Sequence, residues 1–229
     1  MPDFKPFRHF LDEAINLLFP PLCQLCKTMD GNFLNATLCQ SCWEKIYAPS
    51  QLILPRTGTC DAGGFAAGTY QGTLQELITR AKFHADPRAF SSLARLLHET
   101  TSRMVTDLPA AICSVPGDPR RLRKRGFDLP GMLAQNLSRK LRIPFQRHWL
   151  KRIRKAVPQT SLTREERLAN LQGVFQSNEA AKDQRIWVMD DVFTTGATAL
   201  ATIAALQAAG ASGVTFSALA RTPELPLDI

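Results

Sequence analysis

The sequence predicts an α/β protein, with a parallel sheet covered by helices on both faces and a small metal-bound head at its N-terminus. Two observations carry this prediction. From about residue 62 onward, short apolar segments alternate with segments of helical periodicity. Before that point, four cysteines stand in two closely spaced pairs. We therefore divide the chain into an N-terminal helix and head, residues 1–61, and an α/β domain, residues 62–229.

The cysteine pairs are Cys23-x-x-Cys26 and Cys39-x-x-Cys42, separated by twelve residues. A Cys-x-x-Cys turn directs two thiolates at one ion, and two such turns complete the tetrahedron that zinc prefers. A shell of four sulfurs leaves no open coordination position, so we expect Zn²⁺ in a structural role. The alternatives are free core cysteines and redox-active pairs.

The α/β domain is predicted from its alternating patterns, taken in chain order. Segments with the composition of strands are 65–70, 110–116, 143–150, 185–190 and 213–221. Segments with helical periodicity are 73–83, 90–105, 129–141 and 197–210, the last with Gly210 as its stop. Residues 117–128 are predicted as a basic loop, and 151–170 as a long mobile loop with a short helical turn.

Positive charge is concentrated in one part of the chain. The formal net charge is +8, but the window from Asp118 to Lys155 holds 13 lysines and arginines against two aspartates, a net +11. Such a block favours a polyanionic partner, either a phosphorylated small molecule or a nucleic acid. The alternative is an ordinary solvated surface.

The stretch "RIWVMDDVFTTGATAL" places two acids before a run of small and hydroxylated residues. Ligands of α/β sheets bind at the carboxyl ends of strands, where the next helix begins and its free N–H groups favour a phosphate. The acids bind hydroxyls and, through water, Mg²⁺. A sugar monophosphate satisfies both halves, with its hydroxyls on Asp190 and Asp191 and its phosphate in the loop Thr194, Thr195, Gly196, Ala197 and Thr198. The alternative is an acidic strand end that runs into a helix cap.

The segment "VMDDVFTTGAT" resembles the signature of type I phosphoribosyltransferases that binds 5-phosphoribosyl-1-pyrophosphate (PRPP). The resemblance extends along the chain to the ComF family, in which an N-terminal zinc ribbon is joined to a phosphoribosyltransferase domain and which is associated with natural transformation. The other segments that carry it are "LLFPPLCQLC", "AKFHADP", "SVP…RLRKRGFD", "VPQTSLTREERLANLQGVF" and "GASGVTFSALART".

The resemblance implies a type I phosphoribosyltransferase fold and three groups of ligand-binding residues. The PRPP loop would contain Asp190, Asp191 and the residues from Thr194 to Thr198, and Mg²⁺ would accompany PRPP. The pyrophosphate-binding segment would contain Arg121, Arg123, Lys124 and Arg125, and a mobile loop that closes over the ligand would contain Arg152, Lys155, Gln159, Arg164 and Arg167. The chain departs from the family at Asp128 and Leu129, where Asn-Gln is usual.

Three functions remain open at this point. The first is a PRPP-binding protein that handles imported single-stranded DNA, with DNA-uptake proteins as further partners. The second is an active phosphoribosyltransferase on a nucleobase or amine, for which we assign no catalytic residue. The third is a regulatory or scaffold protein that senses PRPP. The sequence shows no targeting signal and no apolar run of membrane-spanning length, so we expect a cytoplasmic protein without a transmembrane segment.

Overall fold

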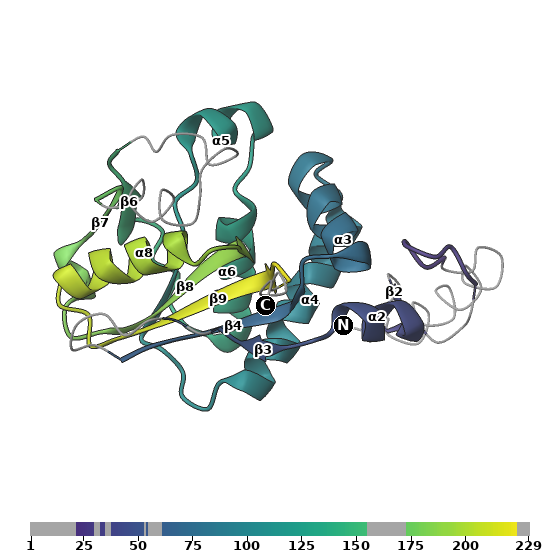
Figure 1. Ribbon diagram of the computed structural model, residues 1–229, viewed down its shortest axis with the longest axis horizontal. Helices are drawn as coiled ribbons and strands as arrows, with labels where there is room; N and C mark the ends of the chain where they lie inside the picture. The colour runs from purple at the N-terminus through teal and green to yellow at the C-terminus, as the bar shows by residue number, and fades with distance from the viewer. Residues whose placement is uncertain are drawn as a thin grey trace, which may run out of the picture.

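The core of the molecule is a five-stranded sheet in the order β3-β4-β9-β8-β5 (Figure 1). The computed structural model describes residues 22–29, 33–34, 38–52, 54, 61–154 and 173–223. Four neighbouring strands are parallel, namely β4 (Asp61–Thr69), β9 (Gly213–Arg221), β8 (Arg185–Phe193) and β5 (Ala111–Ser114). The short β3 (Ser50–Gln51) pairs antiparallel with β4 at one edge. The prediction of a mainly parallel sheet is confirmed.

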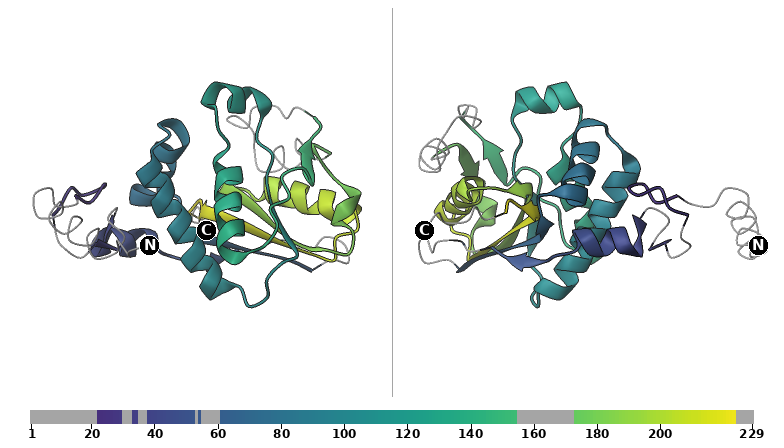
Figure 2. Two further views of the ribbon diagram at one scale, coloured as in Figure 1. Left: turned by 180° about the vertical axis from the view of Figure 1, so that it is seen from behind. Right: turned by 45° about the vertical axis from the view of Figure 1, so that its right-hand side comes forward.

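Helices cover both faces of this sheet (Figures 1 and 2). Along β8, Trp187 and Met189 point to one face, where they pack in one cluster with α3 (Gly72–Phe83), α4 (Pro87–Met104) and α6 (Leu129–Leu141). Ile186 and Val188 point to the other face, which is covered by α8 (Ala197–Ala208) and a hairpin-like pair, β6 (Leu150–Arg152) and β7 (Phe175–Ser177). A short 3₁₀ turn, η2 (Glu179–Ala181), leads into β8. A strand with apolar residues on both sides is what a sheet buried on both faces requires.

The head packs on the outer side of α3 and α4. It contains β1 (Phe33–Leu34), β2 (Leu38–Cys39) and α2 (Gln40–Ile46). Trp43 belongs to the same buried cluster as α3 and α4, and the guanidinium of Arg95 lies 4.6 Å from the centre of its ring. The buried Gln24 side chain donates a 2.7 Å hydrogen bond to the hydroxyl of Ser92. The head therefore shares one core with the sheet.

Two segments differ from the sequence prediction. The basic stretch expected as a loop is a helix, α5 (Pro119–Arg125), because Asp118 caps its first turn through a 2.8 Å bond from the N–H of Arg120 and Gly126 ends it at φ 83°. The expected strand over 143–150 forms only one bridge, between Phe145 and Ile112, before β6 begins. Pro144 has no N–H to donate, which shortens the pairing there.

Among the described residues, no helix is both long enough and apolar enough to cross a membrane. The predicted mobile loop falls mostly on residues 155–172, which lie outside the described part of the chain.

Candidate functional site

The parallel register brings the two candidate segments to the same edge of the sheet. Strands β5 and β8 are direct neighbours, and the N–H of Val115, just beyond β5, donates a 2.9 Å bond to the carbonyl of Met189 in β8. The chain leaves β5 toward the basic helix α5 and leaves β8 toward the hydroxylated loop and α8. The cationic and acidic parts of the predicted site therefore follow adjacent strand ends.

The loop after β8 leads into a helix start that has no side-chain cap. Gly196 adopts a left-handed conformation, φ 80°, immediately before α8, and no side chain caps that helix. The first N–H groups of a helix have no partner within it, and the helix dipole places positive potential there. Thr194 is exposed and Thr195 and Thr198 are partly exposed, whereas Ala197 is buried beneath them. The loop can thus offer both backbone N–H groups and hydroxyls to one phosphate.

The two acids at the end of β8 occupy different environments. Asp191 is buried, and its Oδ2 lies 2.5 Å from the ammonium nitrogen of Lys82 on α3. Asp190 accepts a 2.8 Å hydrogen bond from the N–H of Asp191. Removal from water and, to a smaller extent, the neighbouring charge of Asp191 together raise the pKa of Asp190 to about 8. Asp190 is therefore an uncharged or easily neutralised hydrogen-bonding group near neutral pH.

A third carboxyl, Asp128, faces the same space from the start of α6. Burial raises its pKa, the charge of Asp191 acts in the same direction, and the positive charges of Arg147 and Arg125 oppose the rise. This is the position at which the sequence departs from the ComF pattern. The departure adds an acid to a site that already holds two.

Lys82 is a site residue that the sequence interpretation missed. It lies in "AKFHADP", which was recognised as a block of the resemblance but given no role. The turn that follows it is held firmly, because Arg80 donates two bonds, of 3.1 and 2.8 Å, to the carboxylate of Asp86. The sequence marks only the helix boundary here, with Asp86 and Pro87 at the start of the next helix, and does not indicate that Lys82 reaches Asp191.

The predicted basic residues are found at two places. On α5, Arg121, Arg123 and Lys124 are exposed, and Arg125 is partly buried with its guanidinium 5.3 Å from the ring centre of Phe83. Arg152 lies on β6, where its guanidinium stands 5.6 Å from the ring centre of Phe175. The other members of the predicted mobile loop are outside the described residues: Lys155, Gln159, Arg164 and Arg167.

The four head cysteines form a compact cluster. The sulfur atoms of Cys23, Cys26, Cys39 and Cys42 all lie within 4.8 Å of one another, and those of Cys26 and Cys39 are 3.6 Å apart. Two sulfurs bound at about 2.3 Å to one tetrahedral zinc ion would stand about 3.8 Å apart. The residues therefore fit a zinc ion, which these four cysteines could hold.

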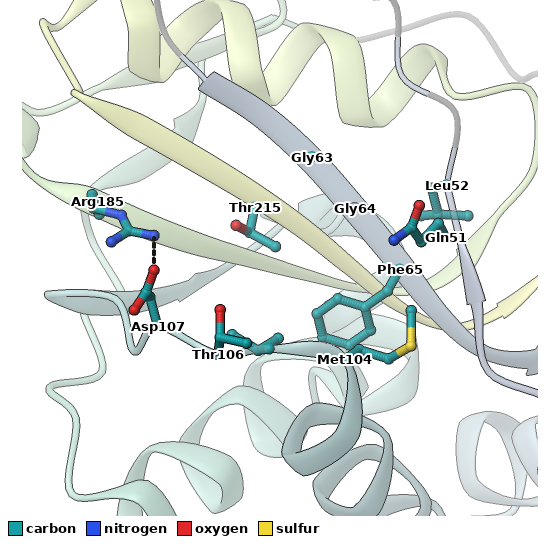
Figure 3. Close-up of a pocket in the computed structure, with 11 residues that line it drawn as sticks. Gln51, Leu52, Gly63, Gly64, Phe65, Met104, Thr106, Asp107, Arg185 and Thr215 are labelled. Atoms are coloured by element: carbon teal, nitrogen blue, oxygen red, sulfur yellow. Dashed lines mark ion pairs between the residues drawn. The ribbon is translucent and has the colours of Figure 1, made fainter.

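A separate cavity of about 320 Å³ lies at the opposite end of the sheet (Figure 3). It is lined by residues of β3, β4, β8 and β9 and by the chain from the end of α4 to Asp107. An ion pair of 3.7 Å joins Arg185 and Asp107 at its margin. Gly63 faces open space there, with no atom within 4 Å of where a Cβ would lie. This cavity is at the amino ends of the strands and is distinct from the candidate phosphate loop.

The chain is similar to proteins of DNA uptake and use. Competence protein F of Haemophilus influenzae is 34% identical over 138 residues, which cover 57% of this chain and 60% of that protein. DNA utilization protein YhgH of Escherichia coli K12 is 33% identical over 157 residues, 67% of this chain and 69% of that protein. The chain belongs to the ComF family. Competence protein ComFC of Bacillus subtilis is 28% identical to this ComF protein, over 57% of the chain and 52% of ComFC. The match with competence protein F spans less than two thirds of that relative, and no protein-family model matches the sequence.

Among solved structures, this ComF protein is similar to phosphoribosyltransferases. Adenine phosphoribosyltransferase from Leishmania tarentolae gives a TM-score of 0.44 at 12% identity, covering 75% of this chain and 94% of the enzyme. Purine phosphoribosyltransferase from Pyrococcus horikoshii gives a TM-score of 0.36 at 20% identity, covering 67% and 79%. These scores describe a distant likeness.

Proposed function

We propose that this ComF protein binds PRPP, or a closely related phosphorylated ribose, at the carboxyl end of β8 and handles single-stranded DNA during natural transformation. The observation that carries the proposal is the pairing of two acids, Asp190 and Asp191, with an uncapped helix start at Gly196. Hydroxyl groups of a ribose suit the acids, and a 5′-phosphate suits the free N–H groups of the loop.

The diphosphate of PRPP would lie toward α5. Its charge would be repelled by the acids of β8 unless cations compensate, and the adjacent strand end leads to Arg121, Arg123 and Lys124. Guanidinium groups bind phosphate oxygens in pairs of parallel hydrogen bonds. Mg²⁺, held through water by the carboxylates and by the diphosphate, would supply further positive charge. The partly buried Lys82 is already present to compensate Asp191.

The DNA part of the proposal is supported by the family and by charge. The relatives are named for competence and for DNA utilization. An exposed basic helix can bind a phosphate backbone without reading sequence. We further propose that zinc in the four-cysteine cluster is structural, because four thiolates fill its coordination and Leu38, Cys39 and Cys42 belong to the core shared with the sheet.

Calorimetric titration with PRPP and Mg²⁺ tests the ligand. Wild-type protein should bind PRPP, and the double variant Asp190→Ala/Asp191→Ala should not, while remaining folded. Arg185→Ala, which alters the separate cavity at the other end of the sheet, is the matched control and should bind like wild type. Equal affinity of the double variant and wild type would refute the site. Release of pyrophosphate on addition of a nucleobase or amine would show that the protein is a transferase.

A further inference from the structure

Phe83 is the one aromatic side chain that is largely exposed among the residues whose side chains the structure describes. It retains 65% of its accessible surface at the end of α3. The aromatic residues within or beside the basic segment of the sequence pack against the core instead, as Phe127, Phe145 and Trp149 all do. A phenyl ring exposed to this extent contributes little to folding and is accessible to a partner.

The ring is presented from a firmly held turn. Phe83 ends α3, and the chain reverses within three residues into α4, where the carboxylate of Asp86 accepts bonds from the N–H groups of Arg88, at 2.9 Å, and Ala89, at 3.3 Å. Arg80 binds the same carboxylate from α3. The residue before Phe83 in the chain, Lys82, forms an ion pair with Asp191. The preceding and following residues thus hold Phe83 next to the candidate PRPP site and limit the entropy lost when it binds a partner.

The basic helix α5 stands beside this ring. The guanidinium of Arg125 lies 5.3 Å from the ring centre, and the views agree in placing α5 and the end of α3 on the same side of the molecule (Figures 1 and 2). No residue of α5 is buried. Among the described residues, no carboxylate forms an ion pair with the cations of this helix, which are Arg120, Arg121, Arg123, Lys124 and Arg125. Within the described residues, the four exposed cations, Arg120, Arg121, Arg123 and Lys124, have neither a carboxylate partner nor a packing role, and a polyanion would relieve the repulsion between them.

We propose that Phe83 and Arg125 form a base-stacking site in an interface for single-stranded DNA, with the phosphates of the strand on the exposed cations of α5. The inference rests on the proposed DNA function and gives it a location. A ring beside a guanidinium matches the flat face of a base, whereas positive charge alone would suffice for an acidic protein. Duplex DNA hides its base faces, so a stacking ring favours a single strand.

Fluorescence anisotropy with a labelled 20-mer of deoxythymidine tests the site on the full-length protein. Stacking on an aromatic ring is worth about 5-fold to 150-fold in affinity per base, so Phe83→Ala should weaken binding by a factor in that range. Phe83→Trp should restore it. Leu108→Ala, which removes another exposed apolar side chain, 57% accessible, at the far end of the sheet, is the matched control and should leave affinity unchanged.

Salt and abasic DNA separate stacking from charge. Phe83→Ala should weaken binding by the same factor at every salt concentration, whereas Arg123→Ala should lower the slope of log affinity against log salt by about 0.7. On an abasic strand the Phe83→Ala effect should vanish. Phe83→Ala within twofold of wild type on the thymidine strand, or an equal loss on abasic DNA, would overturn the stacking site.

The proposed function and this inference fail in different ways. If wild-type protein does not bind the oligonucleotide at all, both the DNA part of the proposed function and the proposed interface are wrong. If wild type binds and the ring is irrelevant, only the inference is wrong. The stacking site would also be wrong if the protein bound polyglutamate more tightly than the oligonucleotide and Phe83→Ala weakened both by the same factor. Calorimetry should show unchanged PRPP affinity in Phe83→Ala.

Discussion

The ion pair between Lys82 and Asp191 should contribute measurably to the stability of the folded protein. Its atoms are 2.5 Å apart, and the two side chains keep only 24% and 12% of their exposure. The site also contains Asp190 and Asp128, whose pKa values are raised by burial. Replacing Lys82 by methionine keeps an apolar side chain of similar length but removes the positive charge. Within the described residues, Lys82 is the one cation that forms an ion pair with an acid of this site, Asp191. The variant should therefore be clearly less stable at neutral pH.

The size of the effect follows from how buried the pair is. Breaking a fully buried ion pair typically costs about 3 to 5 kcal/mol, because one charge is left without compensation. Both side chains here retain some contact with water, so we expect about 2 kcal/mol. For a chain of this length that corresponds to a fall in Tm of about 4 to 8 °C. Lowering the pH should reduce the difference, because Asp190, whose pKa is raised to about 8, then carries less negative charge beside the lysine.

Thermal unfolding followed by circular dichroism measures this difference. The matched control is Asp107→Asn, which breaks the exposed pair with Arg185, whose atoms are 3.7 Å apart and whose side chains are 69% and 59% exposed. That change should cost about 0 to 1 kcal/mol. The double variant Lys82→Met/Asp191→Asn should recover most of the lost stability. If Lys82→Met lost no more stability than Asp107→Asn, the ion pair between Lys82 and Asp191 would not stabilise the site.

Three further predictions concern pH, metal and backbone packing. The folded pKa of Asp190, about 8, lies above its ordinary value of 3.8, so the folded state holds the proton more tightly and the free energy of unfolding should fall as pH rises from 4 to 8. Asp190→Asn should be at least about 1 kcal/mol more stable than wild type at pH 8. Urea titrations at several pH values should show that its free energy of unfolding falls less between pH 4 and 8 than that of wild type; an equal fall in both proteins would contradict this. Elemental analysis should find one zinc per chain in wild type and in Cys113→Ala but none in Cys42→Ser, and zinc retained by Cys42→Ser would exclude the four-sulfur site. A methyl group at Gly68 would lie 2.5 Å from a backbone oxygen of α2, whereas one at Gly63 would meet nothing within 4 Å. Gly68→Ala should therefore lower stability by about 1 to 3 kcal/mol and Gly63→Ala should not, and equal stabilities would contradict that packing.

The sheet and the helix after β8 could be predicted from the sequence because both are encoded locally. The strand Arg185–Phe193 is apolar on both faces, and Gly196 stands where a left-handed residue must precede α8. Four cysteines at regular spacing likewise specify a cluster without any knowledge of the fold. Such features depend on neighbours in the chain, which the sequence shows directly.

The rest of the site depends on contacts between distant segments. Lys82 reaches Asp191 across more than a hundred residues of sequence, and nothing near Lys82 indicates that partner. The exposure of Phe83 was equally hidden, because a phenylalanine at a helical position is usually buried. The helix α5 was predicted as a loop although Asp118, Pro119 and Gly126 are ordinary helix boundary signals; the density of positive charge obscured them.

A crystal structure of the protein with PRPP and Mg²⁺ tests the central claim most directly. We expect the 5′-phosphate against the backbone N–H groups from Thr195 to Thr198, the ribose hydroxyls on Asp190 and Asp191, and the diphosphate toward α5. PRPP bound elsewhere, for example in the cavity beside Gly63 and Arg185, with the β8 loop empty, would contradict it.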